Sequence, residues 1–247
     1  MFTYMFWGKV LPERAQLDMN FKVNFIADKF DLKGDAFISI ILNQVLVTLK
    51  IDKEVNILTL KRIVSSLLDK EMAKLAFIRG FDYTVVIDRC LKEDLTEDWV
   101  YGIDYPLESG VHTLKEINER MNWLRMLSVG MDGLLIDRCL NDFKSSLTHI
   151  EDAPFYCYRA IESLRNHCSE QNDINDEPRS IQWEFFRNTA LISTEDINFF
   201  TKWSRDIRHG RAVYMSDDEE VTVINKAHQI ISSYLENINK KWLDNPL

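Results

Sequence analysis

Residues 17–28, LDMNFKVNFIAD, carry an apolar side chain at nearly every second position. In an extended chain these apolar residues would face one side and the polar residues between them the other. The alternation predicts a half-buried β-strand whose apolar face covers a core. The apolar positions are Leu17, Met19, Phe21, Val23 and Phe25.

The flanking stretches are also typical of strands. Residues 1–10 and 36–51 are rich in β-branched and aromatic residues, which favour a pleated, half-buried surface. Three strands are therefore predicted before residue 52. Gly34 and its neighbouring aspartates predict a turn between the second strand and the third.

The apolar period then changes from two to that of a helix. A helical stripe runs from Ile57 to Leu75 and ends near Gly80. Two closing strands are predicted at residues 82–91 and 98–105. The Pro and Gly of the following DYPLESG stretch mark a domain boundary. We therefore expect residues 1–106 to form an α+β domain of antiparallel strands plus one helix.

Residues 113–247 have helical periodicity throughout and predict an all-α bundle. Thr113 and Glu116 have the spacing of a capping box, in which each side chain satisfies a free amide at a helix start. Ser216 and Glu219 repeat that spacing before the last helix. The other helices are predicted at residues 131–147, 153–170, 180–191 and 195–209, the last of them capped by Ser193 or Thr194.

Composition favours a reduced, cytoplasmic setting. The cysteines follow no CxxC spacing, so neither structural zinc nor a disulfide framework is expected. No apolar run approaches the ~20 residues that a membrane helix needs, and the first residues do not resemble a leader peptide. No membrane association is therefore predicted. The cysteines are Cys90, Cys139, Cys157 and Cys168.

A basic segment, KWSRDIRHGR at residues 202–211, interrupts a chain whose net charge is −9. On the predicted helix, Lys202, Arg205 and His209 share one face, and the last two lie one turn apart. A guanidinium can hold two phosphate oxygens, and an imidazole can transfer a proton near neutral pH. The alternative is that Arg208, His209 and Arg211 only complement the carbonyl dipoles of a helix end, an effect of ~0.3–1 kcal/mol.

Two segments of the predicted bundle resemble the HEPN superfamily. They are YRAIESLRN at residues 158–166 and RDIRHG at residues 205–210, and the resemblance covers about the last hundred residues. The closest likeness is to HEPN bundles that follow a β-rich domain in bacterial defence and stress proteins. Many HEPN proteins are metal-independent endoribonucleases that act as dimers, so the resemblance implies RNA as a partner, a homodimer, and no metal or cofactor.

The resemblance also implies roles for individual residues. Arg205 would stabilise the charge on the phosphorane, and His209 would exchange protons with the ribose 2′-oxygen or the leaving oxygen. Asp206 would orient one of these two side chains. Cleavage would leave a 2′,3′-cyclic phosphate end. Glu162 would support the motif, although a surface ion pair with Arg159 or Arg165 is the alternative. Lys202, Arg208 and Arg211 would bind RNA phosphates.

The spacing departs from the family pattern, because only three residues separate Arg205 from His209. This keeps open a non-catalytic HEPN-like subunit that binds RNA, a nucleotide or a protein, and a structural helper in a larger assembly. The N-terminal domain is a possible site for a protein partner. A cation site at residues 217–220, or zinc held by His149, His167 and neighbouring cysteines, is less favoured than a helix first turn or core packing.

Overall fold

The chain folds into two compact units, Met1–Asp104 and Tyr105–Leu247. The predicted boundary at Pro106 lies outside the described residues. The computed structural model describes residues 1–101, 113–149, 152–209 and 215–244, with the backbone alone at 29, 217 and 239–244. In these ranges, no helix is long and apolar enough to span a membrane.

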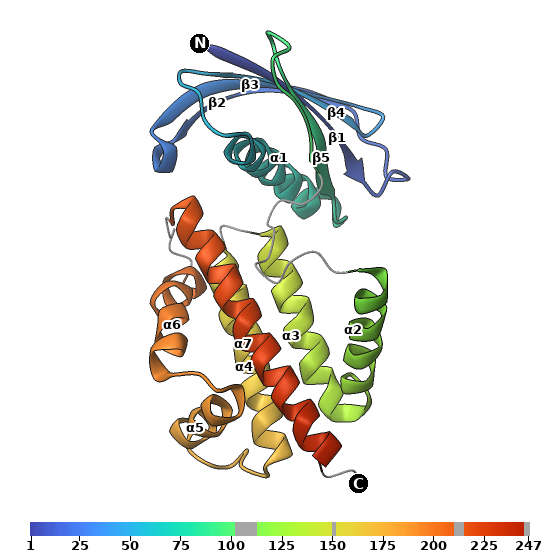
Figure 1. Cartoon of the computed structure of the whole chain (residues 1–247). Helices are drawn as coiled ribbons and strands as arrows, with labels where there is room; N and C mark the ends of the chain where they lie inside the picture. The colour runs from blue at the N-terminus through green and yellow to red at the C-terminus, as the bar shows by residue number, and fades with distance from the viewer. Residues whose placement is uncertain (102–112, 150–151, 210–214, 245–247) are drawn as a thin grey trace. The chain divides into compact units, whose positions relative to one another are not determined.

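The first unit is an antiparallel six-stranded sheet with one α-helix across one face (Figure 1). The strand order is β2-β3-β4-β1-β5-β6, which confirms the predicted α+β class. A single 3-10 turn, η1 (Asp28–Phe30), follows the second strand. The strands are β1 (Phe2–Leu11), β2 (Met19–Ala27), β3 (Leu32–Ile41), β4 (Gln44–Ile51), β5 (Thr84–Lys92) and β6 (Asp98–Val100).

The core of this sheet unit lies between the strands and α1 (Ile57–Arg79). Leu60 and Leu68 on the helix, and Tyr4 and Phe6 on β1, are fully buried there. The Asn56 side chain caps the helix start, and Gly80, with φ 68°, ends it in the left-handed conformation. The helical stripe and its glycine stop are therefore as predicted.

The single strand predicted at residues 36–51 was wrong, because the stretch forms parts of two strands. β3 and β4 pair antiparallel across a two-residue turn, Leu42 and Asn43, with φ values of 48° and 65°. Asparagine tolerates this left-handed conformation, whereas leucine is rarely found there. Four strands therefore precede residue 52, and the turn carries no conventional sequence signal at its first position.

The predicted turn at Gly34 was also wrong. Gly34 lies within β3, where it pairs with Phe25 on one side and Ile51 on the other. A Cβ at this position would lie 2.3 Å from the carbonyl oxygen of Lys50. The glycine is thus explained by a close approach of two strands, and the chain reverses at η1 and Asp31 instead.

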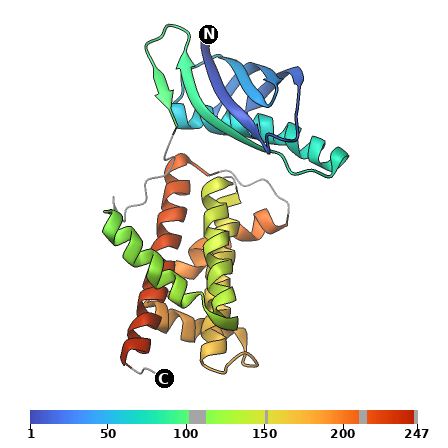
Figure 2. The same cartoon turned by 90° about the vertical axis from the view of Figure 1, so that its right-hand side faces the viewer.

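The second unit consists, in its described part, of six helices, which confirms the all-α expectation (Figure 2). The predicted capping boxes are present: Thr113 with Glu116, and Ser216 with Glu219. The helices are α2 (Leu114–Leu127), α3 (Gly130–Thr148), α4 (Ala153–Gln171), α5 (Arg179–Ala190), α6 (Thr194–Arg208) and α7 (Asp217–Asp244).

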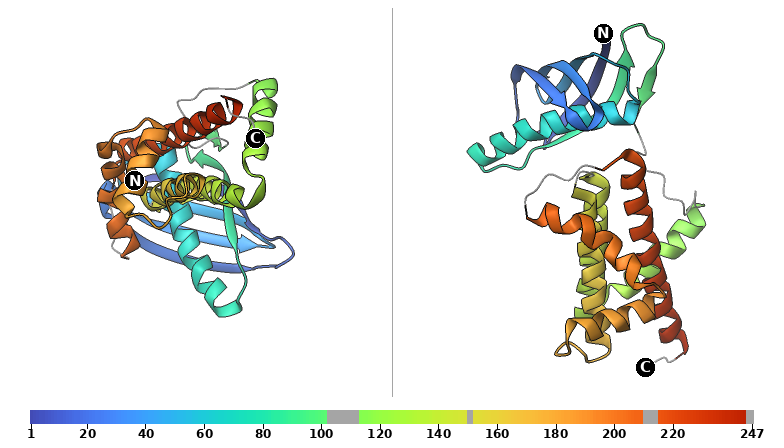
Figure 3. Two further views of the ribbon diagram at one scale, coloured as in Figure 1. Left: turned by 90° about the horizontal axis from the view of Figure 1, so that it is seen from below. Right: turned by 90° about the vertical axis from the view of Figure 1, so that its left-hand side faces the viewer.

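Helix α4 is central to this helical unit and contacts α3, α5, α6 and α7; Figure 3 shows α6 lying against it. Its buried face includes Cys157, Ile161 and Leu164, all fully buried. Phe155 and Tyr158 on the same helix are half-buried. Small residues, including Ala160 and Ser163, are buried on the same helix.

Candidate functional site

Helix α6 carries the predicted site residues Arg205 and His209 and packs against the core of the helical unit. Ser193 caps its start by accepting a hydrogen bond from the backbone N–H of Asp196. Ile197, Phe200 and Ser204 are buried, while Ile207 is half-buried. The buried stripe fixes which residues of α6 face solvent.

The exposed face of α6 carries the predicted basic residues. Lys202, Arg205, Arg208 and His209 are all exposed. His209 is the C-terminal cap residue, and its backbone N–H donates to the carbonyl of Arg205 at 3.2 Å. Arg205 and His209 therefore lie one turn apart with both side chains accessible.

The remaining predicted residues of the basic segment differ in their surroundings. Asp206 is half-buried. The ammonium of Lys202 lies 4.3 Å from the ring centroid of Trp203, a cation–π distance. Gly210 and Arg211 lie outside the described residues. Trp203 is thus covered by a cation from its own helix.

Glu162 lies half-buried on α4, close enough to affect two neighbours electrostatically. Burial is the main cause of the raised pKa of Tyr158, and the Glu162 carboxylate raises it further. Arg159, considered above as an ion-pair partner, instead donates from Nε to Asp142 of α3 at 3.0 Å. Glu162 therefore belongs to the surroundings of Tyr158 and Arg165.

Arg165 is a site residue that the sequence did not reveal. It is only 5% exposed, and its Nε and Nη1 have no hydrogen-bond partner among the described residues. Its Nη2 donates to Asn166 Oδ1 at 2.5 Å, and its guanidinium lies 5.1 Å from the Trp183 ring centroid. Burial lowers the pKa of Arg165, Glu162 opposes that change, and Arg179 adds to it.

Two further arginines, on other helices, lie within electrostatic range of Tyr158. Arg179 is the first residue of α5, and Arg208 lies near the end of α6. Both carry positive charges that act to lower the pKa of Tyr158 against the effect of burial. Arg165, Arg179 and Arg208 are called the arginine cluster below. The Tyr158 ring stacks on Trp183 beside it, with centroids 6.2 Å apart.

The residues considered for a cation site have structural roles in the described part of the chain. Glu219 closes the capping box with Ser216. His167 Nδ1 lies 2.7 Å from the Tyr234 hydroxyl, and burial raises the pKa of Cys157 to about 12. Within the described ranges, no three His, Cys, Asp or Glu side chains are arranged to hold a metal ion.

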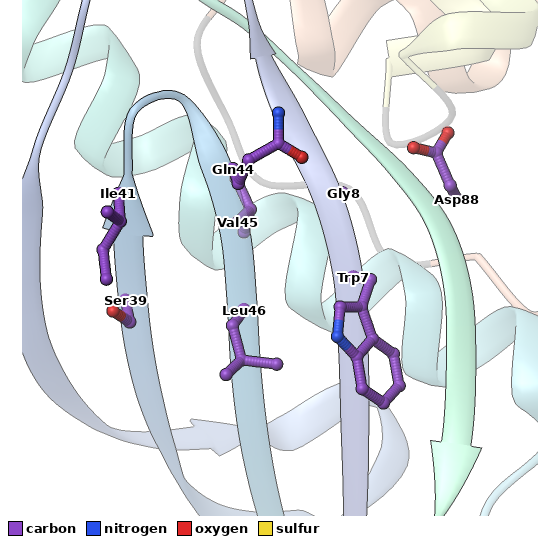
Figure 4. A pocket seen from close by; sticks show the side chains of 8 residues that line it. All are labelled: Trp7, Gly8, Ser39, Ile41, Gln44, Val45, Leu46 and Asp88. Carbon is purple, nitrogen blue, oxygen red and sulfur yellow. The ribbon is translucent and has the colours of Figure 1, made fainter.

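The sheet unit has a shallow hollow of about 250 Å³ on the face opposite α1 (Figure 4). Its polar side chains are few, and no base or nucleophile pair converges among them. It offers an apolar surface rather than a reaction site. Its lining residues are Trp7, Gly8, Ser39, Ile41, Gln44, Val45, Leu46 and Asp88.

Comparison with known proteins gives two matches. Residues 4–101 match the model described as Domain of unknown function (DUF8168) N-terminal domain. Residues 121–239 match the model described as Domain of unknown function (DUF8168) C-terminal domain. Together the two matches cover most of the chain and follow its division into a sheet unit and a helical unit. No curated protein and no solved structure matches the chain.

Proposed function

We propose that this chain, which belongs to the DUF8168 family, is a HEPN-like, metal-independent endoribonuclease of bacterial defence or stress response. The observation that carries the proposal is the pair at the end of α6. Arg205 and His209 are exposed, one helical turn apart, and joined through the hydrogen bond between their backbones. Two side chains so placed can reach the same phosphodiester.

The proposed reaction uses the RNA's own ribose as nucleophile. The 2′-oxygen attacks phosphorus and loses its proton to a base, the bond to the 5′-oxygen breaks, and that oxygen gains a proton. His209 carries these proton transfers, since an imidazole exchanges protons near neutral pH. Arg205 stabilises the charge on the phosphorane through its fork of N–H donors. Asp206 orients one of the two side chains.

The other basic residues of α6 would hold the RNA backbone. Lys202 and Arg208 are exposed along the helix that bears Arg205, and Arg211 follows in the chain. Because the net charge is −9, RNA contact would stay local to this segment. This explains how an acidic protein binds an acidic polymer at one place.

The proposal includes a homodimer, because HEPN half-sites face each other across a two-fold axis and such interfaces are self-complementary. Three apolar residues, Met131, Tyr234 and Trp242, are candidates for this interface. Met131 is 80% exposed and is available, whereas Tyr234 is fully buried; the side chain of Trp242 lies outside the described residues. The sheet unit would recruit a protein partner. The proposed location is the cytoplasm.

The proposal is tested by measuring cleavage of single-stranded RNA in EDTA by the full-length protein and its variants. Arg205→Ala and His209→Ala should each lower the single-turnover rate by about 100-fold or more, the usual scale for a charge-stabilising or proton-transferring group. Arg138→Gln, an exposed arginine on α3, is the matched control and should cleave normally. Equal rates for all four proteins would contradict the proposal.

A second function, a non-catalytic HEPN-like subunit that binds RNA, a nucleotide or a protein, is favoured by the short Arg205–His209 spacing. It predicts RNA binding without turnover. Binding would weaken in a variant with Lys202, Arg205 and Arg208 all changed to Gln. Turnover by the wild-type protein that His209→Ala abolishes would exclude this second function.

A further inference from the structure

We infer that Arg165, Arg179 and Arg208 form a binding site for a phosphate group. This arginine cluster draws on α4, α5 and α6 and does not include Arg205 or His209. The inference goes beyond the proposed ribonuclease and holds whether or not that pair is catalytic.

The first argument is the burial of Arg165. Arg165 is 5% exposed, and its Nε and Nη1 atoms are buried, so the guanidinium has lost most of its hydration, a loss that is costly unless other groups replace the water. Its Nε and Nη1 donors have no partner among the described residues, and the single bond to Asn166 uses Nη2 alone. Arginine stays protonated in proteins, so these donors require an acceptor.

The second argument is the local excess of positive charge. Arg179 and Arg208 lie close enough to act electrostatically on the same tyrosine, Tyr158, and Arg179 also acts on Arg165. Among the described residues, the Glu162 carboxylate acts on both Tyr158 and Arg165. Three guanidinium groups against one carboxylate leave the cluster positive, which favours an anion carrying more than one charge.

The third argument is the start of α5. This helix of twelve residues has no side-chain cap and no acidic residue in its first turn. Its first N–H groups and its dipole favour a negative group, and Arg179 occupies its first position. The helix start therefore adds to the positive potential around the buried Arg165 donors. An anion bound there would compensate this potential.

A phosphate fits these features better than a carboxylate. It offers several acceptor oxygens at tetrahedral angles, so it can accept from two or three guanidinium forks at once, and arginine suits such recognition. A terminal phosphate or nucleotide and an internal phosphodiester of RNA share this chemistry. The competing candidate is a carboxylate supplied by a second copy of the chain.

The test is isothermal titration calorimetry on the full-length protein with three probes. They are inorganic phosphate and 2′-O-methyl RNA oligonucleotides with a 5′-phosphate or a 5′-hydroxyl, which lack the nucleophile for cleavage. Arg179→Gln and Arg208→Gln should each weaken binding about tenfold, the loss expected for one charged hydrogen bond. Both residues are exposed, so neither change should unfold the chain.

Arg138→Gln is the matched control and should bind all probes normally. A preference for the 5′-phosphate oligonucleotide that Arg179→Gln removes assigns a terminal phosphate, and equal Arg179-dependent binding of both oligonucleotides assigns an internal one. Absence of binding by the wild-type protein, or unchanged binding in both variants, overturns the inference. Loss of a dimer in the variants during sedimentation, with phosphate binding unchanged, also overturns it.

The Arg205→Ala protein separates this inference from the ribonuclease proposal. If it binds phosphate normally and cleaves RNA as fast as the wild type, only the ribonuclease proposal fails. If cleavage depends on Arg205 while the wild type binds no phosphate probe, only the arginine cluster fails.

Discussion

In the sheet unit, Arg89 donates two hydrogen bonds to the Asp98 carboxylate, at 2.7 and 2.5 Å, whereas in the helical unit the buried Arg165 leaves two nitrogens without a protein acceptor among the described residues. Arg89 lies on β5 and Asp98 on β6, so neighbouring strands bring the pair together. The arginine cluster instead draws on α4, α5 and α6. The contrast concerns these particular arginines, since each unit also holds other paired cations, such as Lys92 with Glu54 in the sheet unit and Arg159 with Asp142 in the helical unit.

Each unit also buries polar side-chain atoms that have no hydrogen-bond partner among the described residues. In the sheet unit these atoms are the Tyr4 hydroxyl, a neutral group whose burial costs far less than that of a charge, and Nε of the half-buried Arg62. In the helical unit they are the neutral Trp123 Nε1 and two nitrogens of Arg165, which differs from Arg62 in being only 5% exposed. The proposed phosphate site depends on this buried guanidinium and its unsatisfied donors.

The largest effect should come from emptying the core beneath α6. Phe200 is fully buried, and Phe200→Ala should lower the free energy of unfolding by about 3–5 kcal/mol, the usual cost of removing a buried ring. Urea denaturation followed by circular dichroism measures it. Phe185→Ala, at a phenylalanine 42% exposed on α5, is the matched control and should cost much less. Similar losses of unfolding free energy in the two variants would show that the buried Phe200 ring does not hold α6 against the core.

In the sheet unit, Asn43 should give the next largest effect. Its side chain accepts from the Leu17 N–H at 2.6 Å and donates to the carbonyl of Val10 at 3.0 Å. Asn43→Ala should cost about 2–4 kcal/mol, because buried backbone groups lose partners and φ stays positive. Asn43→Gly loses the hydrogen bonds without the strain, so its stability should fall between those of the wild type and Asn43→Ala in urea denaturation. A stable Asn43→Ala protein would contradict this.

The structure of the sheet unit was predictable where a local pattern decides it. The alternation at residues 17–28 and the stripe of α1 depend only on which face is apolar, and both are found. The β3–β4 turn was missed because Leu42 occupies a conformation that leucine rarely adopts. Asn43 stabilises the turn through contacts more than 25 residues away along the chain, and such contacts are not visible in a local pattern.

The candidate site, too, could be predicted only where a local sequence pattern decides it. The faces of α6 follow from helical spacing, so the exposure of Arg205 and His209 could be predicted. Arg165 and Arg179 could not, because the burial of one and the approach of the other depend on how α4 and α5 pack. In the sequence alone, Arg165 is an ordinary neighbour of Glu162 on a helix surface.

A pH-dependent effect should distinguish the helical unit. His167 is buried beside the Tyr234 hydroxyl, and burial lowers its pKa, although Asp132 opposes this. The folded chain then keeps it neutral while the unfolded chain protonates it near pH 6.5. Stability is therefore complete above about pH 6.5 and is lost as the pH falls toward the lowered folded pKa, by at most about 1.4 kcal/mol per pH unit.

The measurement for His167 is urea denaturation at pH 7.5 and 5.5. His167→Asn should be less stable at pH 7.5 but should lose less on acidification, since the titrating group is gone. The rest of the chain is the same in both proteins, so the difference between the two slopes isolates this residue. Identical slopes would mean that His167 is protonated equally in the folded and unfolded chain.

The smallest effect is expected for the paired cation of the sheet unit. The Asp98 carboxylate raises the pKa of Arg89, but both side chains are about half exposed, and exposed pairs contribute little. Arg89→Gln should leave the thermal midpoint and the phosphate affinity unchanged. A loss of phosphate binding in this variant would contradict the distinction between the paired Arg89 and the arginine cluster.

The most direct test of the proposed ribonuclease is the chemical nature of its products. The wild-type protein, incubated with end-labelled single-stranded RNA in EDTA, should leave 2′,3′-cyclic phosphate and 5′-hydroxyl ends, and His209→Ala should leave the RNA intact. Products with 3′-hydroxyl ends, cleavage that continues in His209→Ala, or uncut RNA with the wild-type protein would contradict the account.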